Sequence, residues 1–537
     1  MSDVAADDDE RGGPGDPAGA EPLPPGSPPP PANADVAAWL AVAAGTLGAL
    51  MATLDISIVN SSLPTIQGEI GASGTEGTWI ATAYLVAEIT IIPLSGWLER
   101  VLGLRTFLLL AATLFIGFSM LCGFSTTLPM MIVGRVGQGF TGGALIPTAM
   151  TIIATRLPRH QQPVGNSLFG ATAIMGPVTG PVLGGWLTEN ISWHYAFFIN
   201  LPVGIALITL LLVAMPHQKP KFDLVRDADW FGIVGIAMAL GGLTVVLEEG
   251  EREQWFSSPE IRWLTLVSAI GFVFISIGQI TKSRPVIRLA LLRDRQFAAV
   301  VAMAIVIGMA IYGTSYAIPQ FLSIIAGYNS LQSGEVVLLS GVPMMLMMPF
   351  MPFLVRNLDI RIAVTFGMAL LAWSAWMETD LTSLSTGGVF AESQLMRGFG
   401  TVFSMMFLNQ AAIRSVPPEQ ASDASGLYNS ARNLGGSFAL AGIAVIQDQR
   451  TWLHSRRIEE TLSANSVGVQ DYMAQQTQAL GGSSAAIQSL GNMIEVQALT
   501  MTYADLFFIL AVGILCVTPL VLFLRPLPQG AKPVTGH

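Results

Sequence analysis

Six charged residues stand inside otherwise apolar segments of the chain, and their types are the ones that could do chemistry: Asp55, Glu88, Arg135, Glu392, Arg397 and Arg432. A charged side chain at the centre of a bilayer costs roughly 2.5–3.5 kcal/mol, so such residues persist by facing water or the protein interior and by pairing. Burial favours the neutral form of a carboxylate, whereas a nearby arginine favours the ionised form. A carboxylate held between these influences can take up and release a proton, and this is the chemistry that the pattern indicates.

Three of these residues are expected at similar depth in the first half of the chain. At 1.5 Å per residue, Asp55 and Arg135 lie about 12 Å and about 10 Å from the outer ends of their predicted helices, and Glu88 lies about 14 Å into its own. We therefore expect Asp55 and Arg135 to attract each other, with Glu88 nearby. Asp55 is interpreted as a proton-exchanging carboxylate tuned by Arg135, and the alternative is a purely structural ion pair. Glu88 is either a proton or cationic-substrate site, or a satisfied interior polar group.

The sequence argues against an enzyme built on a metal, a cofactor or a phosphate loop. The five histidines show no metal-ligand spacing, and the two cysteines, Cys122 and Cys516, lie in separate apolar runs. No lysine follows a glycine, so the G-x-x-x-x-G-K-[ST] phosphate loop does not occur. We expect no enzymatic activity, no cofactor and no metal site.

The composition defines the elements that must position these residues. The chain has 537 residues, of which 52% are apolar and only 12% charged, whereas soluble globular chains carry roughly 25% charged residues. A membrane span needs about 20 mostly apolar residues. The recurring apolar segments predict an all-α integral membrane protein with fourteen transmembrane helices, near residues 36–63, 79–97, 104–124, 128–154, 163–187, 195–214, 229–247, 262–280, 296–325, 335–354, 362–377, 387–413, 421–446 and 502–524.

The basic residues predict how these helices are oriented. If residue 1 lies inside the cell, eighteen of the 26 Lys and Arg residues fall in inner segments, five in outer loops and three within spans. Basic residues favour the cytoplasmic side, so both termini are predicted to be cytoplasmic. Residues 1–35 carry eight acids, one base and nine prolines, which predicts a disordered acidic tail.

The order of the segments predicts two six-helix bundles separated by two inserted helices. The acidic outer stretch 248–260 divides the two inserted spans, which carry no interior charge. The predicted domains are a cytoplasmic tail at 1–35, a first bundle at 36–215, two inserted helices at 226–283, a second bundle at 290–525 that includes a periplasmic loop at 447–501, and a cytoplasmic tail at 526–537.

An internal repeat supports the two halves. Arg135 falls in the fourth predicted span and Arg397 in its counterpart, the twelfth. A polar turn containing proline follows each, and then a helix rich in small residues, at 165–177 and 424–436. We expect the second half to place four polar residues in its interior: Glu392, Arg397, Asn429 and Arg432.

A glycine face marks the fifth predicted span. Gly176, Gly180 and Gly184 are spaced by four residues, which places them on one side of a helix. Small residues let helices approach closely, and proline removes a backbone donor and permits bending. The run GPVTGPVLGG also contains Pro177, Pro181 and Gly185. It predicts a helix that packs closely and adapts its shape as the bundles move.

These motifs together resemble the major facilitator superfamily, and specifically its fourteen-helix drug:proton antiporters of the EmrB/QacA type. The resemblance covers about residues 38–525. It rests on LDISIVNSSLP (54–64), WIATAYLVAEITIIPLSGW (79–97), RVGQGFTGG (135–143), GPVTGPVLGG (176–185), WHYAFFINLPVG (193–204) and ASGLYNSARNLGGS (424–437).

The resemblance implies roles for particular residues. It implies proton coupling at Asp55, a buried arginine at Arg135 and an antiporter motif at 176–185. The chain departs from the pattern where most superfamily members carry an aspartate, because Arg100 stands there, and where His194 replaces a usual arginine. Glu88 is not a general family residue.

The function implied is export of apolar or cationic drug-like compounds across the bacterial inner membrane, by alternating access and in exchange for protons. The resemblance also implies a periplasmic membrane-fusion adaptor and an outer-membrane channel as partners, with no nucleic acid. Two alternatives remain at this stage. One is a dedicated exporter of a metabolite, such as a siderophore or an organic acid, or an importer; the other is a membrane receptor that does not transport.

Overall fold

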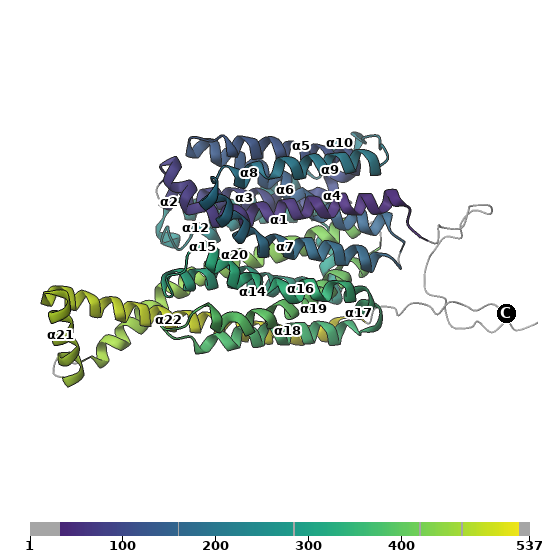
Figure 1. Ribbon diagram of the computed structural model, residues 1–537. Coiled ribbons are helices and arrows are strands. Elements are labelled where there is room, and N and C mark those ends of the chain that lie inside the picture. The colour runs from purple at the N-terminus through teal and green to yellow at the C-terminus, as the bar shows by residue number, and fades with distance from the viewer. Residues whose placement is uncertain are drawn as a thin grey trace, which may run out of the picture.

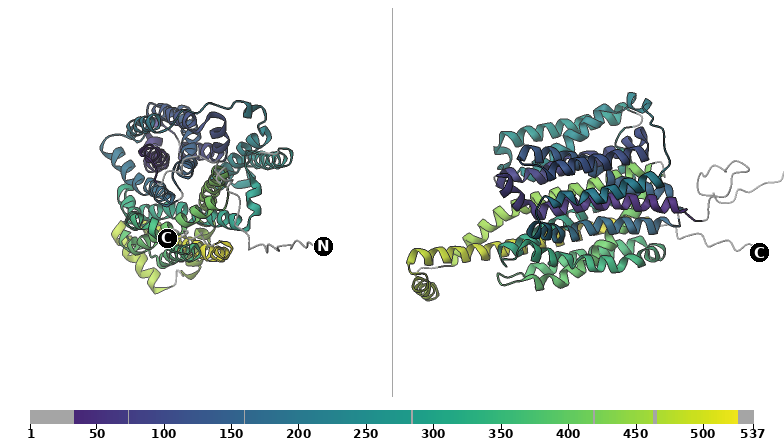
Figure 2. Two further views of the ribbon diagram at one scale, coloured as in Figure 1. Left: turned by 90° about the vertical axis from the view of Figure 1, so that its right-hand side faces the viewer. Right: turned by 45° about the horizontal axis from the view of Figure 1, so that its top comes forward.

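The computed structural model describes residues 33–525, apart from 73, 159, 283–284, 418–419 and 463–465. Within this part of the chain every regular element is a helix, and no strand occurs. Figures 1 and 2 show the long helices running side by side as a bundle. Residues 1–32 of the predicted tail at 1–35, and the whole predicted tail at 526–537, lie outside the described residues.

The first half of the bundle begins at an N-cap, where the Asp35 side chain accepts from the backbone N–H of Ala38 at 2.8 Å. A side-chain cap of this kind satisfies a donor that the first helical turn leaves unpaired. The helices of this half are α1 (Val36–Ile70), α2 (Gly74–Gly77), α3 (Trp79–Ile91) with its continuations η1 (Ile92–Leu94) and α4 (Ser95–Leu102), α5 (Leu104–Gly123), α6 (Leu128–Arg156), α7 (Gln162–Asn190), α8 (Tyr195–Phe198) and α9 (Asn200–Ala214).

The segment of the chain that connects the two halves contains α10 (Asp223–Arg226), α11 (Trp230–Ile236), the short π-helix η2 (Ala237–Gly241), α12 (Gly242–Glu249), η3 (Trp255–Ser257) and α13 (Pro259–Thr281). The sequence places Glu249 in the acidic outer stretch 248–260, but the structure brings it into the interior. Glu249, the last residue of α12, is only 3% exposed. Because α12 packs on α3, the Glu249 carboxylate accepts from the Thr82 hydroxyl at 3.0 Å and pairs with Arg252 at 2.8 Å.

Helices of the second half also begin at aspartate N-caps. Asp294 accepts from the backbone N–H groups of Gln296 and Phe297 at the start of one helix, and Asp359 caps another. The elements are η4 (Leu289–Arg293), α14 (Arg295–Ile324), α15 (Ser330–Leu338), α16 (Gly341–Met347), η5 (Met348–Phe350), α17 (Met351–Asn357), α18 (Ile360–Met377), η6 (Glu378–Asp380), η7 (Gly387–Val389), α19 (Phe390–Arg414), α20 (Ala421–Thr461), α21 (Val467–Leu480), α22 (Ser483–Val517) and η9 (Thr518–Phe523).

Ten helices of the described chain are long and apolar enough to cross a membrane, or eleven if the two parts of the bent α7 count as one span. The long helices α6, α19 and α20 are not among them, although each coincides with a predicted span. The fold class is therefore confirmed as an all-α membrane protein, whereas the number of fourteen spans stays a prediction.

Each half packs around an apolar core of its own. One core joins α1, α5, α6 and α9, with buried residues such as Phe115 and Leu207. The other joins α14, α18 and α19, with Phe297 and Phe407 at its centre. Figure 1 shows the two halves as separate layers, the purple-to-blue helices on one side and the green helices on the other. Separate cores allow two halves to move as bodies, although the exact domain boundaries remain a prediction.

Residues 447–462 and 466–501 form a helical arm that projects from one end of the bundle (Figure 1). The predicted spans end at 446 and restart at 502, but α20 runs on to Thr461 and α22 begins already at Ser483. Polar contacts join the two helices at the base of the arm, where His454 Nε2 lies 2.9 Å from Asp505 Oδ2. We call this end of the bundle the arm end, and the end where α1 begins the opposite end.

The glycine face of α7 lies against α1. A Cβ atom added at Gly176, Gly180 or Gly184 would overlap Thr53, Ser57 or Ser61 respectively. The three α1 residues and the three glycines are each spaced by four, so the contact continues over two turns. The absence of side chains on α7 is therefore what permits the two helices to approach so closely.

We expect Gly180→Ala to destabilise the protein by about 1–3 kcal/mol, because the new methyl group overpacks the α1–α7 contact. The matched control is Gly442→Ala in α20, where an added Cβ meets nothing within 4 Å. The measurement is unfolding of the purified protein by denaturing detergent. Equal stability of the two variants would contradict the assigned packing.

Candidate functional site

Asp55 and Arg135 form an ion pair in the interior of the first half. Arg135 Nη1 donates to Asp55 Oδ2 at 2.6 Å, and both residues are 0% exposed. Asp55 lies on α1 and Arg135 on α6, seven residues after its start at Leu128. The structure thus places together the acid and the base that the sequence places at similar depth.

Two amides complete the coordination of the Asp55 carboxylate. Gln138 Nε2 donates to Asp55 Oδ1 at 2.9 Å, and Asn200 Nδ2 donates to the same oxygen at 2.7 Å. Ser119 accepts from both amides and donates to the carbonyl of Phe197. Sequence reasoning misses these partners, although Gln138 stands one turn after Arg135 and Asn200 stands in the quoted stretch 193–204. The feature of the sequence that could have identified them is a polar side chain inside an otherwise apolar motif.

The guanidinium of Arg135 is also held by α3. Arg135 Nε donates to the carbonyl of Ile80 at 3.0 Å, and the guanidinium carbon lies 4.3 Å from the centre of the Tyr84 ring. A cation over an aromatic face is attracted by the ring quadrupole. Helices α1, α3 and α6 therefore meet at the buried Arg135, and α9 joins them through the contact of Asn200 with Asp55.

Glu88 does not join this cluster. It lies on α3 one turn beyond Tyr84, is 2% exposed, and accepts from Asn433 Nδ2 at 3.2 Å. Tyr312 in turn donates to Asn433 Oδ1 at 3.2 Å. Asn433 belongs to α20 and Tyr312 to α14, so Glu88 makes a polar contact between the two halves.

Glu88 also lines a cavity of about 420 Å³ between the halves. Its walls come from the arm-end portions of α1, α7, α14 and α15 and from α19 and α20. Pro177 and Pro181 face the cavity, so α7 turns its glycines toward α1 and its prolines toward this space. Many of the lining side chains are hydroxyls or amides, among them Ser57, Asn60, Ser61, Thr314, Ser315, Gln320, Ser323, Ser333, Ser340, Gln394 and Thr401. The remaining lining residues are mostly apolar or aromatic, such as Ile56, Ile146, Ile311, Tyr312 and Leu440.

The second half buries its own arginine with a different acid. Arg397 lies on α19, seven residues after its start at Phe390, and donates through Nη2 to Glu378 Oε2. Ser393 donates to the other oxygen of Glu378 at 2.7 Å. Glu378 was missed, because it directly follows a predicted span. The prediction of an interior Glu392 is wrong: Glu392 is exposed in the first turn of α19, where its charge complements the positive helix end.

The other two predicted polar residues of the second half are buried on α20. Arg432 lines the cavity beside Tyr312 and is 5% exposed. Asn429 is 0% exposed and donates to the carbonyl of Ser425 at 2.9 Å. Its side chain also lies 3.6 Å from the sulfur of Met150 on α6, which is a contact between the halves.

Ion pairs join the halves at the opposite end. Asp423, at the start of α20, pairs with Arg100 of α4 at 3.0 Å and with Arg288 at 3.1 Å. The resemblance implies an aspartate at position 100, and here the acid that pairs with Arg100 is on the facing helix α20. The cavity thus lies toward the arm end and the connecting ion pairs lie at the other.

No group of three or more His, Cys, Asp or Glu side chains that could hold a metal ion occurs among the described residues. The arrangement that the structure offers is instead a sealed carboxylate–guanidinium pair beside an interhelical cavity. This combination is suited to moving protons and a solute.

Residues 45–440 match the family described as Major Facilitator Superfamily. The chain is 35% identical to the colistin resistance protein EmrB of Acinetobacter baumannii over 480 residues, which cover 88% of this chain and 94% of that protein. It is 29% identical to the multidrug export protein EmrB of Escherichia coli over 488 residues, which cover 90% and 95%. A double-tryptophan mutant of XylE superposes with a TM-score of 0.60 at 13% identity, covering 91% of this chain and 96% of that one.

The chain therefore belongs to the Major Facilitator Superfamily. Within it, the chain is similar to EmrB proteins, whose names describe multidrug export and colistin resistance, and its apolar helices make it a multi-pass membrane transporter.

We expect Arg135→Gln to destabilise the fold by about 3–5 kcal/mol, since it leaves a buried carboxylate without its counter-ion. The double variant Asp55→Asn/Arg135→Gln removes both charges and should recover a large part of that loss. Unfolding in denaturing detergent measures both, with the exposed Arg262→Gln as control. A double variant as unstable as the single one would contradict the pairing.

Proposed function

We propose that this transporter is a proton-coupled antiporter that exports apolar or cationic drug-like compounds by alternating access. The observation that carries the proposal is the Asp55–Arg135 pair, an acid fully removed from water yet surrounded by hydrogen-bond donors. Asp55 carries the proton, and Arg135 stabilises its ionised form. Each proton entering down a potential of 100 mV supplies about 2.3 kcal/mol, which is enough to concentrate a solute roughly fiftyfold.

Helix α3 links this proton site to the cavity. Ile80, Tyr84 and Glu88 are spaced by four residues and lie on one face of α3. The first two contact Arg135, and the third contacts Asn433 of the second half. Rearrangement of Arg135 when Asp55 gains a proton would therefore shift α3 and the contact of Glu88 with α20. Glu88 itself offers the cavity a carboxylate for a cationic solute or a second proton.

The placement of the cavity supports alternating access. It lies toward the arm end, while Asp423 holds Arg100 and Arg288 at the other. With both termini in the cytoplasm, as the basic residues predict, the cavity faces the periplasm and the ion pairs close the cytoplasmic side. Opening the cytoplasmic side requires those pairs to break, while the arm end closes over the solute.

The arm supports a role for periplasmic partners. Residues 447–501 project beyond the bundle as helices on the side that this orientation makes periplasmic. We propose that a membrane-fusion adaptor contacts this arm and passes the solute to an outer-membrane channel.

Proton coupling is tested with ethidium as the probe cation in proteoliposomes that carry a pH gradient equivalent to about 100 mV. Wild-type protein should accumulate ethidium up to about fiftyfold and move protons when ethidium is added. We expect Asp55→Asn to equilibrate ethidium without accumulation, because its neutral side chain takes up no proton. The control is Glu392→Gln, which removes an exposed acid. If ethidium transport by Asp55→Asn kept the pH dependence of the wild type, Asp55 would not be the proton carrier.

Alternating access is tested at the ion pairs of the opposite end. Asp423→Asn should weaken the contact with Arg100 and Arg288 and expose the neighbouring interface. We expect a cysteine placed at the buried Ser425, in a Cys122→Ser/Cys516→Ser background, to react several-fold faster with a membrane-impermeant maleimide. Asp227→Asn, an exposed acid at the same end, is the control. A rate that does not change would show that these pairs do not hold the interface closed.

A further inference from the structure

A small pocket between α7 and α16 carries a side-chain chemistry that the proposed function does not use. Its lining residues are Ala171, Met175, Gly341, Met344, Met345, Met348, Val402 and Met406. None of these side chains contains nitrogen or oxygen, and the only heteroatom among them is the thioether sulfur of methionine. The lining therefore offers soft sulfur donors and no other ligand.

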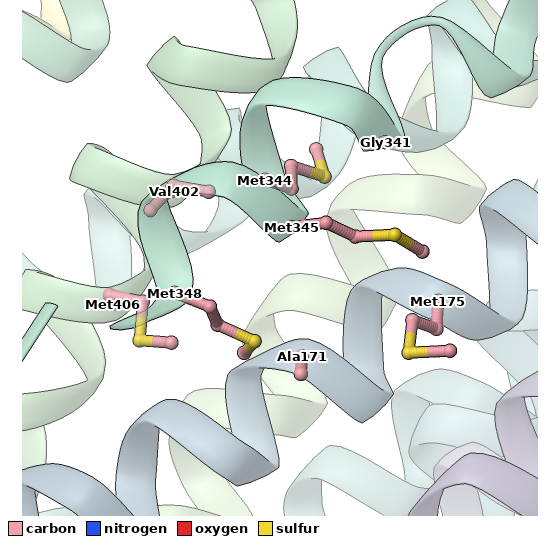
Figure 3. Close-up of a pocket in the computed structure, with 8 residues that line it drawn as sticks. All are labelled: Ala171, Met175, Gly341, Met344, Met345, Met348, Val402 and Met406. Atoms are coloured by element: carbon pink, nitrogen blue, oxygen red, sulfur yellow. The ribbon is translucent and has the colours of Figure 1, made fainter. Parts of the chain in front are cut away.

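Three of the five methionines meet where the two halves of the transporter touch. Met345 of α16 and Met348 of η5 are three residues apart, which places them on one side of a helical segment. Figure 3 shows both side chains extending from the second half toward α7, where Met175 and Ala171 face them. Because α7 belongs to the first half, the sulfur donors come from both halves.

The size of the pocket decides what it can hold. Its volume is about 20 Å³, and roughly 10–15 Å³ is enough for one water-sized particle. The pocket therefore admits a single ion and excludes an organic solute. Met344 lines both this pocket and the larger cavity, so an ion in the cavity has a path to the sulfur atoms.

Thioether ligands select soft metal ions. Ca²⁺ and Mg²⁺ prefer oxygen ligands, whereas methionine sulfur is a soft ligand that selects Cu(I). Three neutral sulfur atoms bring no charge of their own, so they suit a monovalent ion better than a divalent one. Methionine is unbranched and flexible, which allows the side chains to close around an ion. The expectation of no metal site rests on histidine and cysteine, and methionine is a different class of ligand.

We propose that Met175, Met345 and Met348 bind one soft monovalent metal ion, Cu(I), and that the bound ion joins the two halves. It would connect α7 of the first half to α16 and η5 of the second, which already pack against α7. Joining the halves hinders the movement that alternating access requires. The binding itself does not depend on the proposed function, whereas the hindrance rests on it.

Binding is tested on the full chain in nanodiscs, without oxygen and with ascorbate, by competition for Cu(I) against the coloured chelator bathocuproine disulfonate. We expect one ion per chain in the wild type. Met345→Leu/Met348→Leu should bind at least about tenfold more weakly, because even the loss of an outer-shell partner of a metal ligand costs about 10–100-fold. Leucine has a similar volume, so the packing is largely kept.

The matched control is Met493→Leu/Met501→Leu, which removes two exposed methionines of α22 outside the pocket. It should bind Cu(I) as the wild type does, and X-ray absorption at the copper edge should show only sulfur neighbours in both. No binding by the wild type, equal binding by Met345→Leu/Met348→Leu, or nitrogen or oxygen neighbours would overturn the site and leave these methionines as packing groups.

The joining of the halves is tested by ethidium accumulation in proteoliposomes. Cu(I) should slow accumulation several-fold in the wild type and in the α22 control, and should have little effect on Met345→Leu/Met348→Leu. If the wild type bound Cu(I) in nanodiscs but accumulated ethidium at an unchanged rate, the ion would not join the halves. If the wild type failed to accumulate ethidium without copper, the proposed function would fail and the binding result would stand.

Discussion

A guanidinium that is fully removed from water needs an acceptor for its charge and for its N–H groups, and Arg135 obtains them from three helices at once. Asp55 supplies the counter-charge, Gln138 and the Ile80 carbonyl supply further acceptors, and the Tyr84 ring covers one face. The arrangement is costly to disturb, because each partner removed leaves a polar group stranded in a region of low dielectric constant. It therefore fixes the relative positions of α1, α3, α6 and α9, and any proton that reaches Asp55 acts on all of them together.

The second half repeats this constraint but does not seal it. Arg397 occupies the same place along its helix as Arg135 does, yet its acid comes from the end of α18 and one side of its guanidinium lines the cavity. The first half thus keeps its arginine out of the cavity, whereas the arginine of the second half lines it. Both halves nevertheless contribute a charged side chain to the cavity, because Glu88 of the first half also lines it.

The sequence predicts most of the fold because apolar length and glycine spacing are local signals. The glycine face at Gly176, Gly180 and Gly184 is such a signal, and so is the depth of Asp55 and Arg135. The sequence fails where a side chain depends on a helix that is distant in the chain. Glu378 follows a predicted apolar run directly and Glu249 follows another by two residues, so both are predicted to lie in loops. In the structure Glu378 pairs with Arg397, and Glu249 contacts Thr82 and Arg252, and both acids are buried. Glu392 is the opposite case: it is predicted to lie in the interior but is exposed, because α19 begins only two residues before it.

The length of α20 has a consequence beyond the membrane. One uninterrupted helix carries Asp423 at its start, Asn433 against Glu88, and the arm residues up to Thr461. From Asn433 to Thr461 this rod measures about 42 Å at 1.5 Å per residue. A tilt of only about 10° at Glu88 would sweep its far tip through roughly 7 Å, given that length. In the proposed alternating access, the angle of the arm would therefore differ between the two states of the transporter.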